Sequence, residues 1–244
     1  MRKNIYRIGC IILAVTLLSA CSTTKLPGDN EDKSEDTTMI VYPNAYKDIN
    51  PDEVLDARSI ADIAYNPSDV NVMASKSTDI ALVTVTSIDG GSNVNELTGE
   101  YIYPYTYGKL QVLEVFKGDL SEGQEIEYVR MGGIISYNSY LSSLYPAQRE
   151  KIVAQSGVKP AYIKMMFEDD VEIESGKTYL VYMLNSSSGN VSKENAFAII
   201  GWEGGLREAR GVEQLQTRST AEVQIEVFNN YTQSWEFLNQ VITE

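Results

Sequence analysis

The sequence predicts a mainly β domain with several helices (α+β). Two observations favour this class. Apolar, β-branched runs recur between residues 79 and 201 and end at turns that contain glycine, as strands do. One helical pattern interrupts these runs, and further helical patterns precede and follow them. We therefore expect a sheet or barrel with one inserted helix and flanking helices.

The first helix is expected at Asn50-Pro51-Asp52-Glu53, a motif with a cap, a first-turn proline and a capping-box acid. This helix should run toward Tyr65 and stop at Asn66-Pro67, because proline cannot continue a helix. A second, short helix is expected after Ser68.

Strands are expected next, because alternating and β-branched residues replace the helical period. Asp89-Gly90-Gly91, Lys117-Gly118 and Gly132-Gly133 should end the first three strands. A helix is expected at Asn138–Gln155, between the third and fourth strands. The expected strands are Asp79–Ile88, Tyr103–Phe116, Gln124–Met131, Ala161–Phe167, Thr178–Leu184 and Ala196–Gly201, with a further short one near Leu215.

The C-terminal segment favours an amphipathic helix capped by Ser219. A strand over Val223–Val227 is the alternative, because apolar residues alternate there. The helix explains more positions, since large apolar residues recur at spacings of three and four. These residues are Phe228, Tyr231, Trp235, Leu238 and Ile242.

The order of three strands, a helix, and two or more strands is that of an OB-like small β-barrel. An open β-sandwich with appended helices is the alternative arrangement. No internal repeat is visible, so residues 39–244 are expected to form a single globular domain.

Several stretches together resemble bacterial surface lipoproteins whose domain is similar to the OB-fold (netrin-like) inhibitory domain of tissue inhibitors of metalloproteinases. They are STDIALVTVTSI, YGKLQVLEVFKGDLSEGQEIEYV with Gly132-Gly133, and SGKTYLVYML before AFAIIGW. The resemblance covers roughly residues 75–205 and implies the fold. It does not carry over inhibition, because that family chelates the target's zinc through a free N-terminal cysteine held by disulfides. Here the candidate cysteine, Cys21, is expected to carry a lipid.

The N-terminus has the pattern of a secretory signal peptide over residues 1–20, with basic residues before a short apolar run. That run, 8–18, is shorter than the roughly 20 apolar residues of a spanning helix. Leu18-Ser19-Ala20-Cys21 matches the lipobox of bacterial lipoproteins, which implies cleavage before Cys21 and a diacylglyceryl group on its sulfur. Two acyl chains suffice for stable anchoring. We therefore expect a lipid-anchored protein on the extracytoplasmic face of the cell membrane.

Residues 21–38 are expected to be a lipidated cysteine and a flexible acidic linker, because residues 22–38 contain one large aliphatic side chain and no aromatic one. Removal of residues 1–20 leaves 17 basic and 34 acidic side chains, a formal charge of −17. A surface of this sign repels nucleic acid, so no nucleic-acid partner is expected.

The chain contains no histidine, and the expected mature chain contains no free thiol. Catalysis by Ser-His-Asp or Cys-His groups is thereby excluded, as are metal sites built on histidine or thiolate. Glu168-Asp169-Asp170, followed by Glu172 and Glu174, lacks the spacing of a calcium loop and is interpreted as a solvated turn. We expect no metal, no cofactor and no catalytic residue.

Four tyrosines, Tyr101, Tyr103, Tyr105 and Tyr107, alternate along an expected strand and would point to one side. Exposed aromatic residues near strands two and three of an OB barrel are where such folds bind oligosaccharides. An aromatic ladder that packs on the barrel is the structural alternative. Pro104 should confine this segment to a sheet edge or a bulge.

These observations favour a non-enzymatic surface lipoprotein that binds an envelope protein or a saccharide. The alternative is a carboxylate-dependent envelope hydrolase that acts on saccharides. A deep cavity with two inward-facing acids of perturbed pKa would favour the hydrolase. A solute-binding lipoprotein would need two α/β lobes, for which the chain is too short and too rich in strands.

Overall fold

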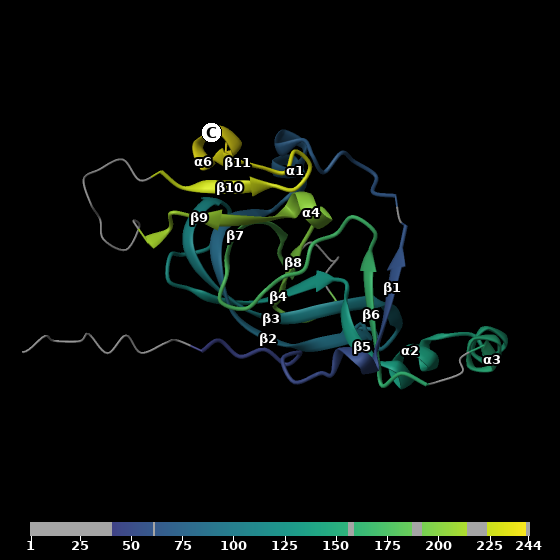
Figure 1. The fold of residues 1–244 in the computed structure, drawn as a ribbon. Helices are drawn as coiled ribbons and strands as arrows, with labels where there is room; N and C mark the ends of the chain where they lie inside the picture. The colour runs from purple at the N-terminus through teal and green to yellow at the C-terminus, as the bar shows by residue number, and fades with distance from the viewer. Residues whose placement is uncertain (1–40, 61, 156–158, 187–191, 214–223, 243–244) are drawn as a thin grey trace, which may run out of the picture. The chain divides into compact units, whose positions relative to one another are not determined.

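The computed structural model describes residues 41–60, 62–155, 159–186, 192–213 and 224–242 (Figure 1). These residues belong to one compact unit, Ile40–Glu244. In chain order its elements are η1 (Pro51–Glu53), β1 (Val54–Ser59), α1 (Val70–Lys76), β2 (Asp79–Val94), β3 (Tyr101–Lys117), β4 (Glu125–Met131), β5 (Gly133–Ser136), α2 (Tyr137–Ser143), α3 (Pro146–Gln155), β6 (Tyr162–Phe167), β7 (Thr178–Leu184), β8 (Phe197–Ile199), α4 (Trp202–Gly205), β9 (Leu206–Arg210), β10 (Glu226–Asn229), β11 (Ser234–Phe237) and α6 (Leu238–Val241).

The fold is mainly β, as predicted. Eight strands form one sheet in the order β11-β10-β9-β7-β2-β3-β4-β8, and β8 pairs with β7 as well as with β4. A second sheet has the order β1-β6-β5 (Figure 1). Most pairs are antiparallel, but β1 runs parallel to β6 and β4 runs parallel to β8.

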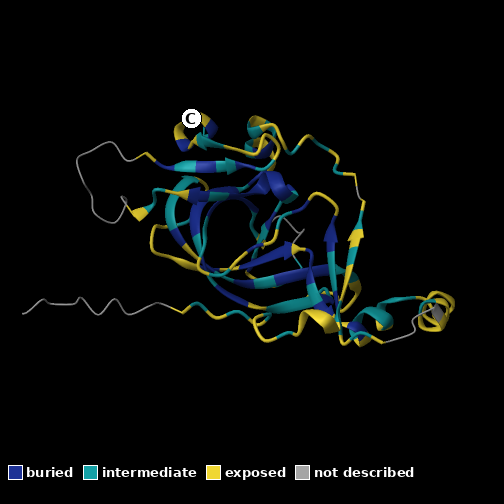
Figure 2. Ribbon diagram, viewed as in Figure 1, coloured by how far each residue is buried: buried dark blue, intermediate teal, exposed yellow. Residues whose placement is uncertain are grey.

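The two central strands are buried on both faces over residues 80–83 of β2 and 179–183 of β7 (Figure 2). In β2, Ala81 and Val83 belong to one apolar cluster, whereas Ile80 and Leu82 belong to another on the opposite face. Residues of β7 alternate between the same two clusters. Because successive side chains of a strand point to opposite faces, both strands need continuous apolar runs, and these runs are what the sequence shows.

The strands expected from the sequence are confirmed with small shifts at their ends, except that β2 continues to Val94. The prediction that Asp89-Gly90-Gly91 ends this strand was wrong. A Cβ atom at Gly91 would collide with the backbone carbonyl of Ile134 in β5. The glycine therefore lets a second strand approach β2 closely, which is a known use of glycine inside strands.

The helix expected from Asn50 toward Tyr65 was also wrong. The Asn50 side chain does accept a hydrogen bond from the Asp52 amide, but the helix is a single 3-10 turn. The chain then enters β1, which pairs in parallel with β6 over its whole length. The predicted cap was therefore correct, but the pairing of β1 with β6 determines the conformation of the residues that follow it. The short helix after Ser68 is confirmed as α1, with Asp69 as its cap.

The helix expected at Asn138–Gln155 is two short helices, α2 and α3, and the strand β5 before them was not predicted. Ser136 caps α2. Helix α3 is mostly exposed (Figure 2). Neither helix is long and apolar enough to span a membrane, and the same holds for the other helices of the described residues.

The prediction of an amphipathic C-terminal helix was wrong, except that a short helix, α6, is present near its end. The segment is a hairpin, β10–β11, in which Phe228 lies opposite Trp235 and their rings meet edge to face at 5.3 Å. Gln233 has a left-handed backbone (φ 54°), which ends any helix here. Two of the aromatic residues whose spacing predicted a helix therefore pack against each other across two strands instead. The expected strand near Leu215 and the Ser219 cap lie outside the described residues, as does Val223 of the alternative strand.

Candidate functional site

A cavity of about 760 Å³ lies at the ends of β4, β7 and β8, and β3, β6 and the segment after β1 provide further walls. Its size falls within the roughly 300–1,000 Å³ of small-molecule sites. Two groups of side chains distinguish its lining: a stack of three aromatic rings and a buried ion pair. Each is built by residues far apart in the sequence.

The aromatic ladder consists of Tyr103, Phe167 and Trp202. Phe167 stacks on Tyr103 with ring centroids 4.7 Å apart and an interplanar angle of 8°. Trp202 contacts Phe167 at the same distance of 4.7 Å, tilted by 37°. Phe167 is therefore the middle ring, and Tyr103 and Trp202 are the outer rings. All three line the cavity.

The parallel pairing of β1 with β6 positions this ladder. Ser59 and Phe167, the last residues of the two strands, are register partners. The Ser59 hydroxyl lies 2.9 Å from the Tyr103 hydroxyl. A guanidinium nitrogen of Arg58 donates to the carbonyl of Phe167 at 3.2 Å. Two outer polar contacts therefore hold the middle ring and one outer ring in place.

Trp202 reaches the ladder through a strained backbone. Its φ of 47° lies in the left-handed region, which is uncommon for a bulky residue. The preceding Gly201 is also left-handed (φ 79°), and a Cβ atom there would meet the Met73 side chain. Such strain costs on the order of 1–3 kcal/mol and is found preferentially at functional sites. The turn aims the indole at Phe167 rather than along β8.

The buried ion pair consists of Arg130 in β4 and Asp170 in the loop after β6. Their residues are 4% and 7% exposed, so both charges are almost fully removed from water. Nη2 of Arg130 donates to Oδ1 of Asp170, which also accepts from the Val171 amide at 2.9 Å. Nε of Arg130 and Oδ2 of Asp170 have no hydrogen-bond partner among the described residues. Burial raises the pKa of Asp170, although the charge of Arg130 opposes this shift.

The charges that line the cavity nearly cancel. Besides Arg130 and Asp170, the one charged lining residue within the described part of the chain is Asp62, which is exposed. The uncharged polar lining includes Asn95, whose Oδ1 already accepts from the Leu97 amide at 2.9 Å. The site is mainly apolar, with a few polar groups that can orient a ligand.

The four tyrosines do not form one continuous stripe. Tyr103 and Tyr105 line the cavity, and the ring of Tyr107 lies 6.3 Å from that of Tyr105. Tyr105 is 2% exposed and donates to the carbonyl of Val94 at 2.9 Å. Tyr101, in contrast, is 52% exposed and does not line the cavity.

An irregularity in the hydrogen-bonded pairing of β2 with β3 explains why the tyrosines are separated. Tyr105 lies opposite Ser92 and Tyr101 opposite Val94, so β3 uses four steps where β2 uses two. Pro104 lies within this irregular stretch, as its lack of an amide donor led us to expect. The period of two, from which one face was predicted for all four rings, is broken between Tyr101 and Tyr105.

The acidic run after β6 is divided among three basic partners. Asp170 pairs with Arg130, Glu172 with Lys164, and Glu174 with Lys177 at 2.8 Å. Among the described residues no three acidic side chains are grouped closely enough to hold a metal ion. The expected lipid site, Cys21, lies outside the described residues, and so does the linker to residue 38.

Sequence reasoning missed four members of the site: Arg130, Phe167, Asp170 and Trp202. For Arg130 a signal existed. Ile126 and Tyr128 alternate with exposed residues in β4, and Arg130 continues the same buried face. An arginine on the apolar face of a strand indicates a buried partner. That partner was part of the acidic run, which we interpreted as solvated.

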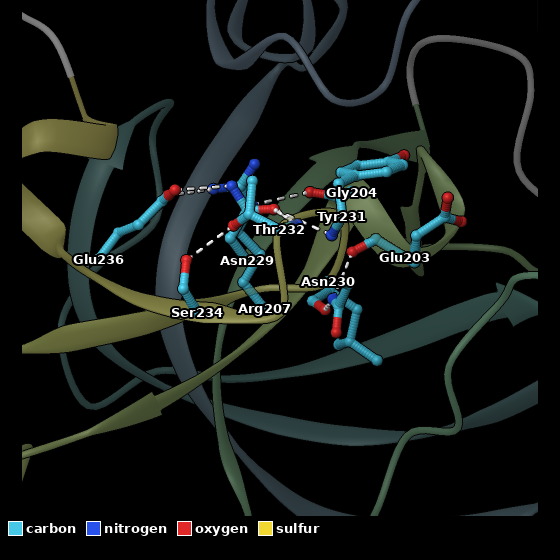
Figure 3. A network of polar contacts seen from close by, with 10 residues as sticks. Glu203, Gly204, Arg207, Asn229, Asn230, Tyr231, Thr232, Ser234 and Glu236 are labelled. Atoms are coloured by element: carbon cyan, nitrogen blue, oxygen red, sulfur yellow. Dashed lines mark hydrogen bonds and ion pairs between the residues drawn. The ribbon is translucent and has the colours of Figure 1, made fainter.

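A second polar cluster, the C-terminal network (Figure 3), shares no residue with the cavity lining. Its centre is Arg207, which is 1% exposed and donates to the Gly204 carbonyl and to Glu236, both at 3.4 Å. Asn229 donates to the other oxygen of Glu236 at 2.7 Å. Burial raises the pKa of Glu203, although an interaction with Tyr231 opposes this shift. The network joins β9 and α4 to the hairpin β10–β11.

A cavity with an aromatic ladder and a neutralised ion pair can bind a ligand that presents both an apolar face and hydrogen-bonding groups. None of the family models, curated proteins or solved structures with which we compared the chain matches it, so this interpretation rests on the geometry of the site.

Proposed function

We propose that this chain is a membrane-anchored bacterial surface lipoprotein whose domain binds a ligand of the cell envelope without transforming it. The lipobox before Cys21 supports the anchor. The absence of histidine from the chain, and of free thiols from the expected mature chain, supports binding rather than catalysis. The observation that carries the proposal is the cavity of about 760 Å³ with the aromatic ladder and the Arg130–Asp170 pair in its lining.

We further propose that the core of the domain is an OB-like barrel, similar to the netrin-like domain of tissue inhibitors of metalloproteinases. The strand pairings support this idea. They run β7-β2-β3-β4-β8 and, through the pairing of Met183 with Ile199, return to β7. Five strands joined in this way correspond to the five-stranded, partly open barrel of OB folds. Side chains of these strands contribute to one apolar cluster, which includes Val83, Leu110 and Tyr128.

The binding function is tested with the full chain purified from membranes in detergent. The chain has two tryptophans, so Trp235→Phe leaves Trp202 as the single reporter. We expect envelope extract to shield Trp202 from a soluble quencher in a saturable manner, because a ligand in the cavity covers the indole. Tyr103→Leu should weaken this protection, and Tyr145→Leu, at a tyrosine outside the cavity, should not. The function would be refuted if the extract does not protect Trp202, or if Tyr103→Leu and Tyr145→Leu are protected equally.

The anchor is tested separately. Cys21→Ser should leave an unprocessed precursor or a released domain, because no sulfur remains for the diacylglyceryl group. Mass spectrometry of the membrane fraction measures the mature N-terminus. A mature chain that starts elsewhere, or an unmodified Cys21, contradicts the lipoprotein assignment.

A carboxylate-dependent envelope hydrolase that acts on saccharides is the second candidate. One observation favours it: burial raises the pKa of both Asp170 and Glu203, and the charge of Asp170 contributes to the shift of Glu203. However, Glu203 does not line the cavity, and Asp170 is engaged by Arg130. New reducing ends after incubation of the chain with envelope polysaccharide, lost in Asp170→Asn, would establish this activity.

A further inference from the structure

We infer that the cavity accepts an uncharged sugar ring of the pyranose type, stacked on an outer ring of the aromatic ladder and hydrogen-bonded at the polar part of the lining. This inference rests on the proposed binding function and specifies its ligand. It follows from three properties of the site: the orientation of the aromatic rings, the position of the polar groups and the balance of charge.

The stacking of the ladder determines which ligand shape fits. Phe167 covers one face of Tyr103 in a nearly parallel stack and contacts Trp202 at a tilt of 37°. A ligand that stacks on Tyr103 or Trp202 must therefore be flat enough to extend the stack. The C–H face of a pyranose is such a surface, because aliphatic hydrogens meet the negative face of an aromatic ring favourably. Quaternary ammonium ions need rings that converge around one point, and a ladder of stacked rings does not surround a point.

The polar groups of the cavity suit hydroxyl groups. Arg130 and Asp170 place a donor group and an acceptor group side by side in the lining. Nε of Arg130 and Oδ2 of Asp170 are buried and have no partner among the described residues, so they can be satisfied only where a hydroxyl group reaches past the surface of the lining. Asn95 adds an amide whose nitrogen donates to no other described residue. Sugar hydroxyls donate and accept at the same time, so neighbouring hydroxyls match a donor–acceptor pair.

The charge balance selects against ionic ligands. Arg130 is already compensated by Asp170, and Asp62 leaves a slight negative excess in the lining. The expected mature chain carries a formal charge of −17. An anionic ligand, such as a phosphate ester or a uronate, would find no uncompensated cation in the described lining and would approach a negative surface. A neutral ligand meets neither obstacle.

The test uses the full chain with Trp235→Phe in detergent and follows the emission of Trp202. The probes are an array of uncharged mono- and oligosaccharides, the acyclic polyol sorbitol, glucuronate and choline. We expect at least one uncharged saccharide to change the emission in a saturable manner. Sorbitol has the hydroxyls but no ring face, so it should have no effect. The inference would be overturned if no uncharged saccharide binds. It would also be overturned if sorbitol, glucuronate or choline binds as tightly as the best saccharide.

Two variants test the proposed contacts for the bound saccharide. Tyr103→Leu should weaken affinity about tenfold, which corresponds to about 1.4 kcal/mol. Replacement of the ion pair by Arg130→Met with Asp170→Leu should weaken it at least as much, because no hydroxyl partner remains. Tyr145→Leu, at an exposed tyrosine outside the lining, should leave affinity unchanged. Full affinity in both cavity variants, with native melting curves, would overturn the inference.

The two proposals fail in different ways. If envelope extract shields Trp202 but no uncharged saccharide does, the cavity binds another class of ligand and only the inference is wrong. If neither extract nor saccharide shields Trp202, the binding function itself is wrong.

Discussion

Two arginines of this protein are almost completely buried, and their surroundings differ. Arg130 lies beside the cavity, and its partner Asp170 has a side chain that is 1% exposed. Arg207 lies in the C-terminal network, and its partner Glu236 has a side chain that is 31% exposed (Figure 3). The first pair is thus removed from water at both ends. The second keeps one end in contact with solvent.

This difference in exposure indicates different roles for the two pairs, one in the candidate site and one in support of the fold. A fully buried ion pair contributes little net stability, because desolvation of both charges offsets their attraction. The Arg130–Asp170 pair is therefore poorly explained by stability alone, and its place in the cavity lining supplies another reason for it. Arg207, in contrast, donates to a backbone carbonyl and to a carboxylate that joins two strands. Its role is to fasten the C-terminal hairpin.

The largest effect is expected for Asp170→Ala. This change strands the charge of Arg130 in a buried position and should lower the free energy of unfolding by about 3–5 kcal/mol. Urea unfolding measures the loss. The neighbouring Asp169 is exposed, so Asp169→Ala should change stability by less than about 0.5 kcal/mol. A loss below about 1 kcal/mol in Asp170→Ala would show that Arg130 regains water, and the contrast between the two arginines would disappear.

A smaller loss, about 1.5–3 kcal/mol, is expected for Arg207→Met. Charge-assisted hydrogen bonds are lost, but Glu236 can be hydrated because it reaches the surface. Arg210→Met is the matched control. Arg210 is half exposed, pairs with Glu226 and lies 4.1 Å over the Trp235 ring, so its loss should cost about 1 kcal/mol or less. The comparison is reversed if Arg207→Met proves more harmful than Asp170→Ala.

Replacement of both members of the cavity pair should have a still smaller effect on stability. Arg130→Met combined with Asp170→Leu removes both buried charges together, and such exchanges are often neutral or stabilising. We expect unfolding free energy within about 1 kcal/mol of the parent or above it. If the double variant is as unstable as Asp170→Ala, the pair is needed for the fold and not for a ligand.

The smallest effect concerns pH and the C-terminal network. Burial raises the pKa of Glu203 above its ordinary value of 4.5. The folded protein therefore holds this proton at pH values where the unfolded chain has released it, and the contribution of Glu203 to stability falls as pH rises from about 4.5 through the raised pKa. Glu203→Gln keeps the size of the side chain and one carbonyl oxygen but cannot ionise.

The Tm of Glu203→Gln should match that of the parent near pH 4 and exceed it at pH 8, where the parent holds a buried charge at this position. Glu208, whose side chain is 42% exposed and pairs with Lys177 at 3.0 Å, provides the control Glu208→Gln. Its Tm difference from the parent should not show this rise. Parallel curves for Glu203→Gln and the parent would exclude Glu203 as the source of any pH dependence.

The strands that could be predicted are those whose own residues form an apolar run between polar turns. Thr178–Leu184 was predicted with its observed ends, because β7 is a continuous apolar run between polar turns. The segments that failed depend on distant partners. Val54–Ser59 becomes a strand because β6 lies beside it, and Phe228 pairs with Trp235 across a hairpin rather than along a helix. Local periodicity cannot distinguish these outcomes, since both satisfy the same apolar residues.

The candidate site could be predicted only in part for the same reason. The tyrosines marked the correct strand, and two of them line the cavity. The other rings of the aromatic ladder are Phe167, at the end of β6, and Trp202, at the start of α4, and their meeting depends on the order of the strands in the sheets. The strained turn at Gly201-Trp202 has no signal in the amino-acid pattern beyond the glycine itself.

The outer strands of the two sheets have a consequence for a protein displayed at high density. Among the described residues, β1, β5 and β11 each have one edge without a strand partner, where the edge strand of a neighbouring copy could add by hydrogen bonding. All three are short, with six, four and four residues, and Asp56, Arg58 and Glu236 place charges along β1 and β11. Short, charged edges resist such templated aggregation. The domain can therefore be crowded on a surface without its sheets joining from one copy to the next.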